Sequence, residues 1–301
     1  MMRDFVSLID LSTDDVLGLL DLADDLKERQ RRNEVYRPLE GKNMAMIFEK
    51  PSLRTRMTFE VGIFQLGGHG VFYPTRLGER ESVPDVAHNL ERWVDAIVAR
   101  TFSHEAVTEL ARCASVPVIN ALTDKEHPCQ ILADAQALRE HKGDFAGLKV
   151  VFVGDGNNVF ASWAHFAARI PIDLTLVCPK GHEADAAVLA IARHDAKGKI
   201  VVTHNVEEGV AGADVVYTDV WASMGQEDEA AEREKVFAPY QVNAALMVLA
   251  KKDAVFMHCL PAHRGSEVSD DVIDGPQSIV FDEAENRLHA QKAVMLTLMR
   301  R

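Results

Sequence analysis

The sequence predicts an α/β protein with two domains, each built around a doubly wound parallel sheet. Its 301 residues, 47% of them hydrophobic, are enough for two cores at roughly 150 residues per domain. Short β-rich runs alternate with helical segments as far as the C-terminus, as in parallel sheets. Unusual polar residues directly follow many of the runs, where open parallel sheets bind ligands.

The elements follow one another along the chain in a regular order. An acidic amphipathic helix is expected at roughly 12–32, because "STDD" opens it with capping residues. Strands are expected in the first half at 43–49, 70–74, 95–101 and 116–122. Strands are expected in the second half at 148–154, 173–179, 199–205, 214–220, 254–260 and 278–283. The polar stretch 140–147 between the halves is the candidate domain boundary.

Composition excludes several classes of partner. Lys and Arg total 33 against 46 Asp and Glu, for a net charge of -13, so no nucleic acid is expected. No membrane is expected either, since the longest apolar runs, such as 244–250, are far shorter than the ~20 residues of a span. Acidic residues interrupt any signal peptide: Asp4, Asp10, Asp14 and Asp15. We expect a cytoplasmic protein without a disulfide framework, because its cysteines are few and widely spaced: Cys113, Cys129, Cys178 and Cys259.

The stretch "FEKPSLRTR" at 48–56 gathers cations in an acidic chain: Lys50, Arg54 and Arg56. Ser52 is placed as the N-cap of a helix through "LRTRMTFEVGIFQL". A helix N-terminus attracts anions, and the Arg54 guanidinium with the Thr55 hydroxyl would complete a phosphate cradle. The alternative is a solvated first turn with surface arginines.

Other strand ends carry a histidine, an arginine and a glutamine. His127 and Gln130 lie in "HPCQ" after the fourth strand, and Arg100 ends the third. An imidazole N–H could stabilise an oxyanion, and the Gln130 carbonyl could recognise an amide. Either His127 or Arg100 could instead be structural. Two sheets facing each other would put one site in the cleft between them.

The stretch "GDGNNV" resembles part of a dinucleotide fingerprint and makes a nicotinamide-dependent dehydrogenase an alternative. Gly154 and Gly156 follow a strand, but Val159 occupies the third glycine position. No acidic ribose partner stands about 20 residues further on. Asn157 could cap the following helix.

Four motifs together resemble those of the aspartate and ornithine carbamoyltransferases, over nearly the whole chain. They are "SLRTR" at 52–56, "HPCQ" at 127–130, "DVWASMG" at 219–225 and "HCLP" at 258–261. The third motif resembles the corresponding element of the ornithine enzymes. The aspartate enzymes typically carry proline where this chain has Cys259. Leu53 departs from the family's threonine, and Arg76 stands where many ornithine enzymes carry glutamine.

The resemblance assigns residues to two substrates. It implies carbamoyl-phosphate contacts by Ser52, Leu53, Arg54, Thr55, Arg76, Arg100, His127, Gln130, Cys259, Leu260 and Arg287. It implies ornithine contacts by Asn158, Asp219, Ser223 and Met224. Of these residues it implies catalytic roles for Arg100, His127, Asp219 and Cys259.

The resemblance also implies an activity and an assembly. The carbamoyl group of carbamoyl phosphate would pass to the δ-amine of L-ornithine, a step of arginine biosynthesis, with no metal or organic cofactor. The carbamoyl-phosphate domain would span 1–140, with a C-terminal helix at 286–301 packing back on it, and the ornithine domain 147–285. Two interdomain helices would join them, one near 128–141 and the C-terminal one, and a homotrimer is implied.

Three further alternatives stay open. A carbamoyltransferase for an acylated ornithine or putrescine would keep the phosphate site and change the second one. A non-catalytic paralogue would bind carbamoyl phosphate without turnover. Zinc could bind His258, Cys259 and His263, although this spacing fits no closed structural site.

Overall fold

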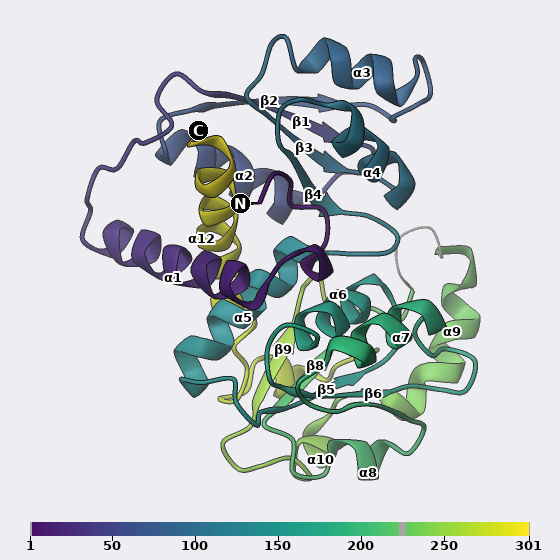
Figure 1. Cartoon of the computed structure of the whole chain (residues 1–301). Coiled ribbons are helices and arrows are strands. Elements are labelled where there is room, and N and C mark those ends of the chain that lie inside the picture. Colours follow the sequence, from purple (N-terminus) through teal and green to yellow (C-terminus); the bar gives the residue numbers. More distant parts are fainter. Residues whose placement is uncertain (1, 223–226, 301) are drawn as a thin grey trace. The chain divides into compact units, whose positions relative to one another are not determined.

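The computed structural model describes residues 2–222 and 227–300, which form two compact units (Figure 1). The first unit comprises Met1–Gln136 with Glu285–Arg301, and the second comprises Ala137–Ala284. Each unit has its own parallel sheet, so the predicted α/β fold class is confirmed. None of the described helices is long and apolar enough to cross a membrane.

The sheet of the first unit has the strand order β2-β1-β3-β4, with every pair parallel. Its strands are β1 (Asn43–Phe48), β2 (His69–Pro74), β3 (Ala96–Arg100) and β4 (Val118–Leu122). Because β1 and β3 lie side by side in the sheet, their carboxyl ends bring Phe48 and Arg100 into register. Phe5 makes an isolated bridge to Ile119 on β4, which covers part of this edge.

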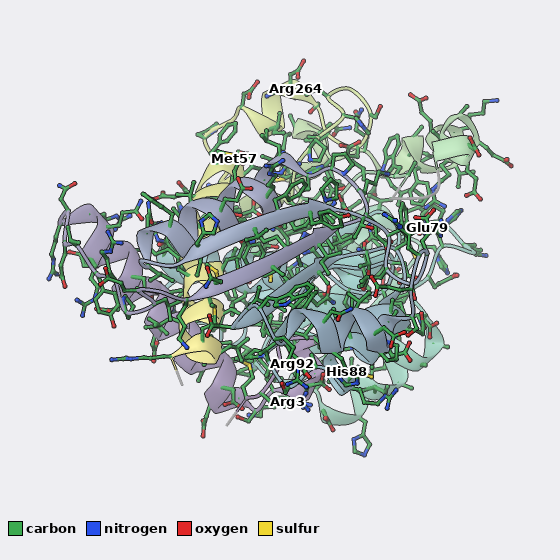
Figure 2. The ribbon with its side chains drawn as sticks, turned by 90° about the horizontal axis from the view of Figure 1, so that it is seen from above. Arg3, Met57, Glu79, His88, Arg92 and Arg264 are labelled. Carbon is green, nitrogen blue, oxygen red and sulfur yellow. The ribbon has the colours of Figure 1, made fainter. Side chains whose placement is uncertain are left out.

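Helices pack on both faces of this sheet. Helix α2 (Leu53–Gln65) lies on one face, and α3 (Val83–Leu90) and α4 (His104–Cys113) lie on the other. The unit also contains η1 (Leu8–Asp10) and α1 (Thr13–Arg31), and α1 is bonded to Gln136 and Lys292. Ile47 and Ile97 point into an apolar cluster with residues of α3 and α4, such as Val107. On the other face Gly70 lies against Ile63 of α2. Figure 2 shows the side chains on the ribbon, with His88 of α3 and Arg92, just after that helix, at the surface.

The sheet of the second unit has the strand order β7-β6-β5-β8-β9, again all parallel. Its strands are β5 (Lys149–Val153), β6 (Asp173–Val177), β7 (Ile200–Thr203), β8 (Val215–Thr218) and β9 (Val255–His258). Its helices are α6 (Asn158–Ala167), α7 (Ala186–Asp195), α8 (Val206–Val210), η2 (Glu227–Glu229), α9 (Ala230–Phe237), η3 (Ala238–Tyr240), α10 (Ala244–Met247) and α11 (Asp270–Ile273). Phe152 stacks on Tyr217 and meets Phe160 of α6 edge to face, which fixes α6 against the sheet.

Two further helices are α5 (Pro128–Lys142), in the middle of the chain, and α12 (Val280–Met299), near its C-terminus. The strand predicted at 278–283 is wrong, because α12 already begins at Val280 instead of near 286. Only Ser278 bridges β9, at Phe256, and Asp282 and Glu283 lie in the first turn of the helix. Acidic residues there complement the helix dipole, which favours the helix over continued pairing with the sheet.

The remaining predicted elements are confirmed with shorter ends. The helix near 12–32 is α1, and Ser12 and Asp15 form a capping box at its start. The nine other predicted strands all exist, each within a few residues of its predicted range.

Candidate active site

Helix α2 begins directly after β1 and presents its N-terminus at the carboxyl end of that strand. Ser52 is the N-cap residue, as predicted, but its hydroxyl makes no capping hydrogen bond. No acidic side chain lies in the first turn. The partial positive charge of this helix end is therefore not offset by the helix's own residues, which suits an anionic ligand.

Thr55 is the meeting point of two arginines from distant parts of the chain. Its hydroxyl oxygen accepts hydrogen bonds from Arg100 Nη1 at 3.4 Å and from Arg287 Nη2 at 3.2 Å. Thr55 is 1% exposed and Arg287 is 2% exposed. The fold thus brings together residues of α2, β3 and α12 that stand far apart in the sequence.

Gln130 belongs to the same group. Its Oε1 accepts a hydrogen bond from Arg287, and its Nε2 donates to Asp134 Oδ1 at 2.7 Å. Sequence reasoning missed Asp134, although its position one helical turn after Gln130 on α5 would have indicated a partner. Asp134 fixes which way the amide of Gln130 faces.

His127 is held neutral by its surroundings. It is 5% exposed, and burial holds its pKa well below the ordinary value. The positive charges of Arg287, Arg100 and Arg54 lower the pKa further. An imidazole without charge keeps one N–H, which can donate to a carbonyl oxygen near neutral pH.

Glu49, which the sequence analysis did not single out, ties the neighbouring loops to the end of β1. Its two carboxylate oxygens accept from the backbone N–H groups of Leu77, at 2.9 Å, and Phe102, at 2.8 Å. Arg76 stands beside this anchored turn, but it is exposed and makes no hydrogen bond or ion pair with the residues that the structure describes. Its side chain lines a hollow with Tyr73 and Trp93 instead.

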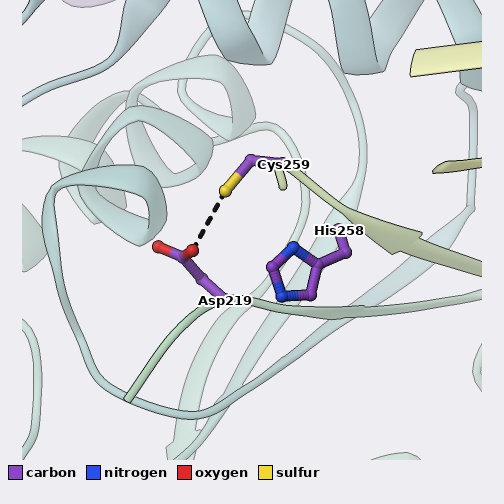
Figure 3. A group of neighbouring side chains, drawn as sticks. All are labelled: Asp219, His258 and Cys259. Carbon is purple, nitrogen blue, oxygen red and sulfur yellow. Dashed lines mark hydrogen bonds between the residues drawn. The ribbon is translucent and has the colours of Figure 1, made fainter. Parts of the chain in front are cut away.

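In the second unit Asp219 follows β8 and is 7% exposed. Its Oδ1 accepts from the Cys259 thiol at 3.0 Å (Figure 3). The same oxygen accepts from the backbone N–H of Val220 at 2.8 Å. Its Oδ2 accepts from Asn157 Nδ2 at 2.7 Å. Asn157 also caps α6 through its Oδ1, as the sequence suggested, so a single side chain fixes both the helix and the carboxylate.

The end of β9 is set by a buried histidine. His258 Nδ1 accepts from the backbone N–H of Leu260 at 2.9 Å, which leaves the proton on Nε2 to face Glu267 Oε1 at 3.2 Å. Leu260 has φ of 54° and precedes a cis peptide bond to Pro261. Glu267, missed by sequence reasoning, thereby holds the "HCLP" turn through His258.

The hydrogen bonds of His258 argue against the zinc alternative. His258 has both ring nitrogens engaged, and the His263 side chain is 64% exposed. The potential ligand atoms of Asp219, His258 and Cys259 lie within 4.8 Å of one another. Coordination by His258 would break one of its two hydrogen bonds, each to a buried or structural partner.

Of the other residues predicted to contact ornithine, one is described and two are not. Asn158 is the first residue of α6, next to Asn157. Ser223 and Met224 lie outside the described residues. Arg233 of α9 donates to the backbone carbonyl of Trp221 at 2.5 Å and also bonds Asp155, which anchors the chain shortly after Asp219.

The loop after β5 is closed where a dinucleotide would need backbone N–H groups. Gly156 N donates to His182 O at 2.9 Å. A Cβ on Gly156 would lie 2.2 Å from the backbone nitrogen of Ala184, so this glycine serves close packing of two loops. The local structure therefore argues against the dehydrogenase alternative.

Known proteins match the chain over its whole length. The carbamoyl-phosphate-binding domain of aspartate/ornithine carbamoyltransferases matches residues 3–140, and the Asp/Orn-binding domain matches residues 146–298. An ornithine carbamoyltransferase of Carboxydothermus hydrogenoformans is 53% identical over 99% of this chain and 97% of that protein. One from Anoxybacillus flavithermus is 52% identical over 99% of this chain and 96% of that protein.

Solved structures agree with the sequence comparison. The ornithine carbamoyltransferase of Pyrococcus furiosus superposes with a TM-score of 0.96 at 49% identity, covering 99% of this chain and 97% of that chain. The anabolic ornithine carbamoyltransferase of Campylobacter jejuni gives 0.93 at 36% identity, covering 99% of both chains. The four sequence motifs, the two parallel sheets and these matches agree: the chain belongs to the aspartate/ornithine carbamoyltransferase family and is a carbamoyltransferase.

Proposed function

We propose that the chain transfers the carbamoyl group of carbamoyl phosphate to the δ-amine of L-ornithine, giving L-citrulline and phosphate. The observation that carries the proposal is the convergence of Arg100 and Arg287 on Thr55, beside the neutral His127. We assign carbamoyl phosphate to a domain at 1–140, and ornithine to a domain at 147–285.

The first domain suits a doubly charged acyl phosphate. The α2 N-terminus from Ser52, with the Leu53 backbone and the Arg54 guanidinium, would bind the phosphate. Arg100, Thr55 and His127 would donate to the carbonyl oxygen. Five further residues are proposed to contact carbamoyl phosphate: Arg76, Gln130, Arg287, Cys259 and Leu260.

The second domain suits an amino acid that carries a second amine. Asp219 would bind the α-ammonium group of ornithine, and Asn158, Ser223 and Met224 would contact the amino-acid end. Aspartate would need cations for its second carboxylate, whereas this pocket presents the Asp219 carboxylate, and the neighbouring Arg233 is already paired with Asp155. The Cys259 thiol, bonded to Asp219, would help to place the δ-amine.

The chemistry needs the neutral form of that amine. Its pKa, similar to the value of about 10.4 for lysine, makes the neutral form scarce near pH 7, so the site must select it. The amine nitrogen forms a bond to the carbonyl carbon, and negative charge moves to the carbonyl oxygen, where Arg100 and His127 donate. The carbonyl double bond then re-forms as the carbon–oxygen bond to phosphate breaks. The departing phosphate takes the proton that the amine loses, and Arg54 with the helix end stabilises the charge that remains on the phosphate.

Exposed apolar side chains support a homotrimer, which we propose as the working assembly. Leu53, Met57 and Phe64 lie along α2, with side chains 75%, 49% and 75% exposed, and Figure 2 labels Met57. Tyr73 of β2 and Trp93 line a hollow of about 950 Å³. Apolar area of this kind is usually covered by another protein surface, here further copies of the chain. Light scattering of the purified protein should give three times the mass of one chain.

We also place the enzyme in the cytoplasm and in arginine biosynthesis. All four cysteines are free thiols, as in proteins of reducing compartments. The relative from Campylobacter jejuni is described as anabolic, which agrees with citrulline formation.

The test is citrulline formation with competing amines. Purified protein is given carbamoyl phosphate with ornithine, N-acetylornithine, putrescine or aspartate at equal concentration. The proposal predicts carbamoylated product from ornithine at least about a hundredfold faster than from the other amines, since a site built for a charged group rejects analogues lacking it. Binding of carbamoyl phosphate without citrulline would support the non-catalytic alternative, and a faster reaction with putrescine or N-acetylornithine would replace ornithine as the substrate.

A further inference from the structure

Lys292 occupies an unusual position on the inner face of α12. Only 5% of the residue is exposed. Its aliphatic stem crosses α2 at Gly62, where a Cβ would lie 3.1 Å from Lys292 Cγ. Its Nζ donates to Gln65 Oε1 of α2 at 3.0 Å and to Gln30 Oε1 of α1 at 3.3 Å. The amine therefore lies where three helices meet.

This amine has only neutral partners. Within the described residues no carboxylate oxygen lies within 4.0 Å of Lys292 Nζ, and the acceptors are the two glutamine amides. Burial without a compensating charge lowers the pKa of Lys292 to about 8. A sizeable share of the side chain is thus an unprotonated amine near neutral pH, which an ordinary exposed lysine is not.

Lys292 also borders a cavity whose wall carries further charged groups. Lys292 lines a cavity of about 300 Å³ with residues of α1, of the turn after it and of α2. The charged groups on its wall are Arg29, Glu34 and Arg37. Arg29 is paired with Asp25 and Glu34, whereas the one ion pair of Arg37 among the described residues is with Glu40, at 3.9 Å. Arg37 can therefore turn to a new anion in the cavity without losing a strong ion pair.

We propose that Lys292 is a carbamate-forming site, at which Nζ takes up carbon dioxide reversibly. The neutral nitrogen forms a bond to the carbon of CO₂, one C=O π bond becomes a C–O⁻ bond, and the nitrogen releases a proton to water. No oxidant or reductant is needed. The product is a carbamate anion that accepts from Arg37 and, after rotation of their amides, from the NH₂ groups of Gln30 and Gln65.

The adduct would change the charge at a junction that leads to the active site. Helix α12 carries Arg287, and α2 carries Thr55, which Arg287 contacts. Lys292 joins the same two helices further along. Conversion of a cation into an anion there gives carbon dioxide a point of influence on how α12 packs against α2, independent of which amine the enzyme carbamoylates.

The experiment labels the whole protein with ¹³C-bicarbonate at about pH 8 and traps carbamates as ethyl esters with a trialkyloxonium salt. Peptide mass analysis then locates the label. Lys251 is the control within the chain, because it bonds Asp214 at 2.7 Å and this bond raises the pKa of Lys251. We expect label on Lys292 about a hundredfold above Lys251, in proportion to the neutral amine. Equal labelling of both lysines, or no label on Lys292, overturns the proposal.

Two further measurements keep the result decisive. Lys292→Met should lose the label, while Lys251→Met keeps it, and label that persists in Lys292→Met contradicts the assignment. If Lys292→Met does not fold, the unmodified protein is labelled across a pH series. The label on Lys292 should then rise with a midpoint near the pKa of about 8, and a rise only above about pH 10 would contradict the proposal.

Discussion

The Cys259 thiol donates a hydrogen bond to the Asp219 carboxylate across 3.0 Å, and both residues follow neighbouring strands of the second unit. The bond joins the "HCLP" turn to the end of β8, so two of the four sequence motifs are in direct contact (Figure 3). The carboxylate is buried, and it has partners on both oxygens.

Asp219→Asn should reduce kcat/KM for ornithine by about 10- to 100-fold. The change keeps the size of the side chain and removes its charge, and a charge-assisted hydrogen bond contributes roughly 1.5–3 kcal/mol. Affinity for carbamoyl phosphate, measured by calorimetry in the absence of ornithine, should stay within about twofold. An equal loss for both substrates would contradict the division of labour between the two domains.

Asn157 has two functions that substitutions can separate. Asn157→Ala should lower the free energy of unfolding by about 1 kcal/mol, through the lost helix cap, and also raise the KM for ornithine. Asn157→Ser should keep most of the stability, since serine also caps, yet still raise the KM because it lacks the Nδ2 donor to Asp219. The matched control is Asn205→Ala, which removes the cap of α8 and should cost stability alone. The account is wrong on this point if Asn157→Ser leaves the KM unchanged.

His127 makes stability depend on pH with a definite sign. Burial lowers its pKa in the folded protein, whereas the unfolded chain has an ordinary value near 6.5. Below that value the unfolded state binds more protons, so stability falls as the pH drops. Relative to His127→Gln, the unmodified protein should lose about 1.4 kcal/mol between about pH 7.5 and pH 5.5, as measured by urea unfolding. Parallel pH curves for the two proteins would show that His127 titrates normally.

Gly62→Ala tests the packing of α12 on α2, and Gly18→Ala on α1 is its control. Gly62→Ala should destabilise by about 1–3 kcal/mol, because the new Cβ would lie 2.9 Å from Met295 Cε and 3.1 Å from Lys292 Cγ. Gly18→Ala on α1 should stabilise by about 0.5–1 kcal/mol, because a Cβ there has no neighbour within 4 Å. Thermal and urea unfolding of both variants would check the signs, and a stabilising Gly62→Ala would contradict the close contact of these helices.

The sequence predicted nine strands in their correct order along the chain, but the tenth strand that it predicted, at 278–283, is wrong. Parallel strands are buried on both faces, so runs such as "KVVFVG" stand out, and the residues directly after them are where ligands bind. "SIVFDE" has the same apolar character, yet the chain there pairs with β9 only around Phe256 before turning into a helix. Local composition cannot distinguish a brief bridge from a strand.

Partners that act through long-range hydrogen bonds could not be predicted. Glu49 and Glu267 give no signal of their own in the sequence, because the N–H groups that donate to them are brought close only by the fold. Asp134 is different, since its spacing from Gln130 on one helix was visible. Arg100 and Arg287 were found through the family resemblance, while their convergence on Thr55 depends on how three elements pack together.

The central claim is that carbamoyl phosphate binds at the start of α2 through Arg54, and calorimetry with Arg54→Ala and Arg56→Ala tests it most directly. Arg56 is the matched control, since it is paired with Glu60 at 2.9 Å and lies over the Phe72 ring at 3.7 Å. The account predicts millimolar or tighter binding by the unmodified protein and by Arg56→Ala, and at least about tenfold weaker binding by Arg54→Ala. Undetectable binding by the unmodified protein, or equal affinities for the two variants, would contradict it.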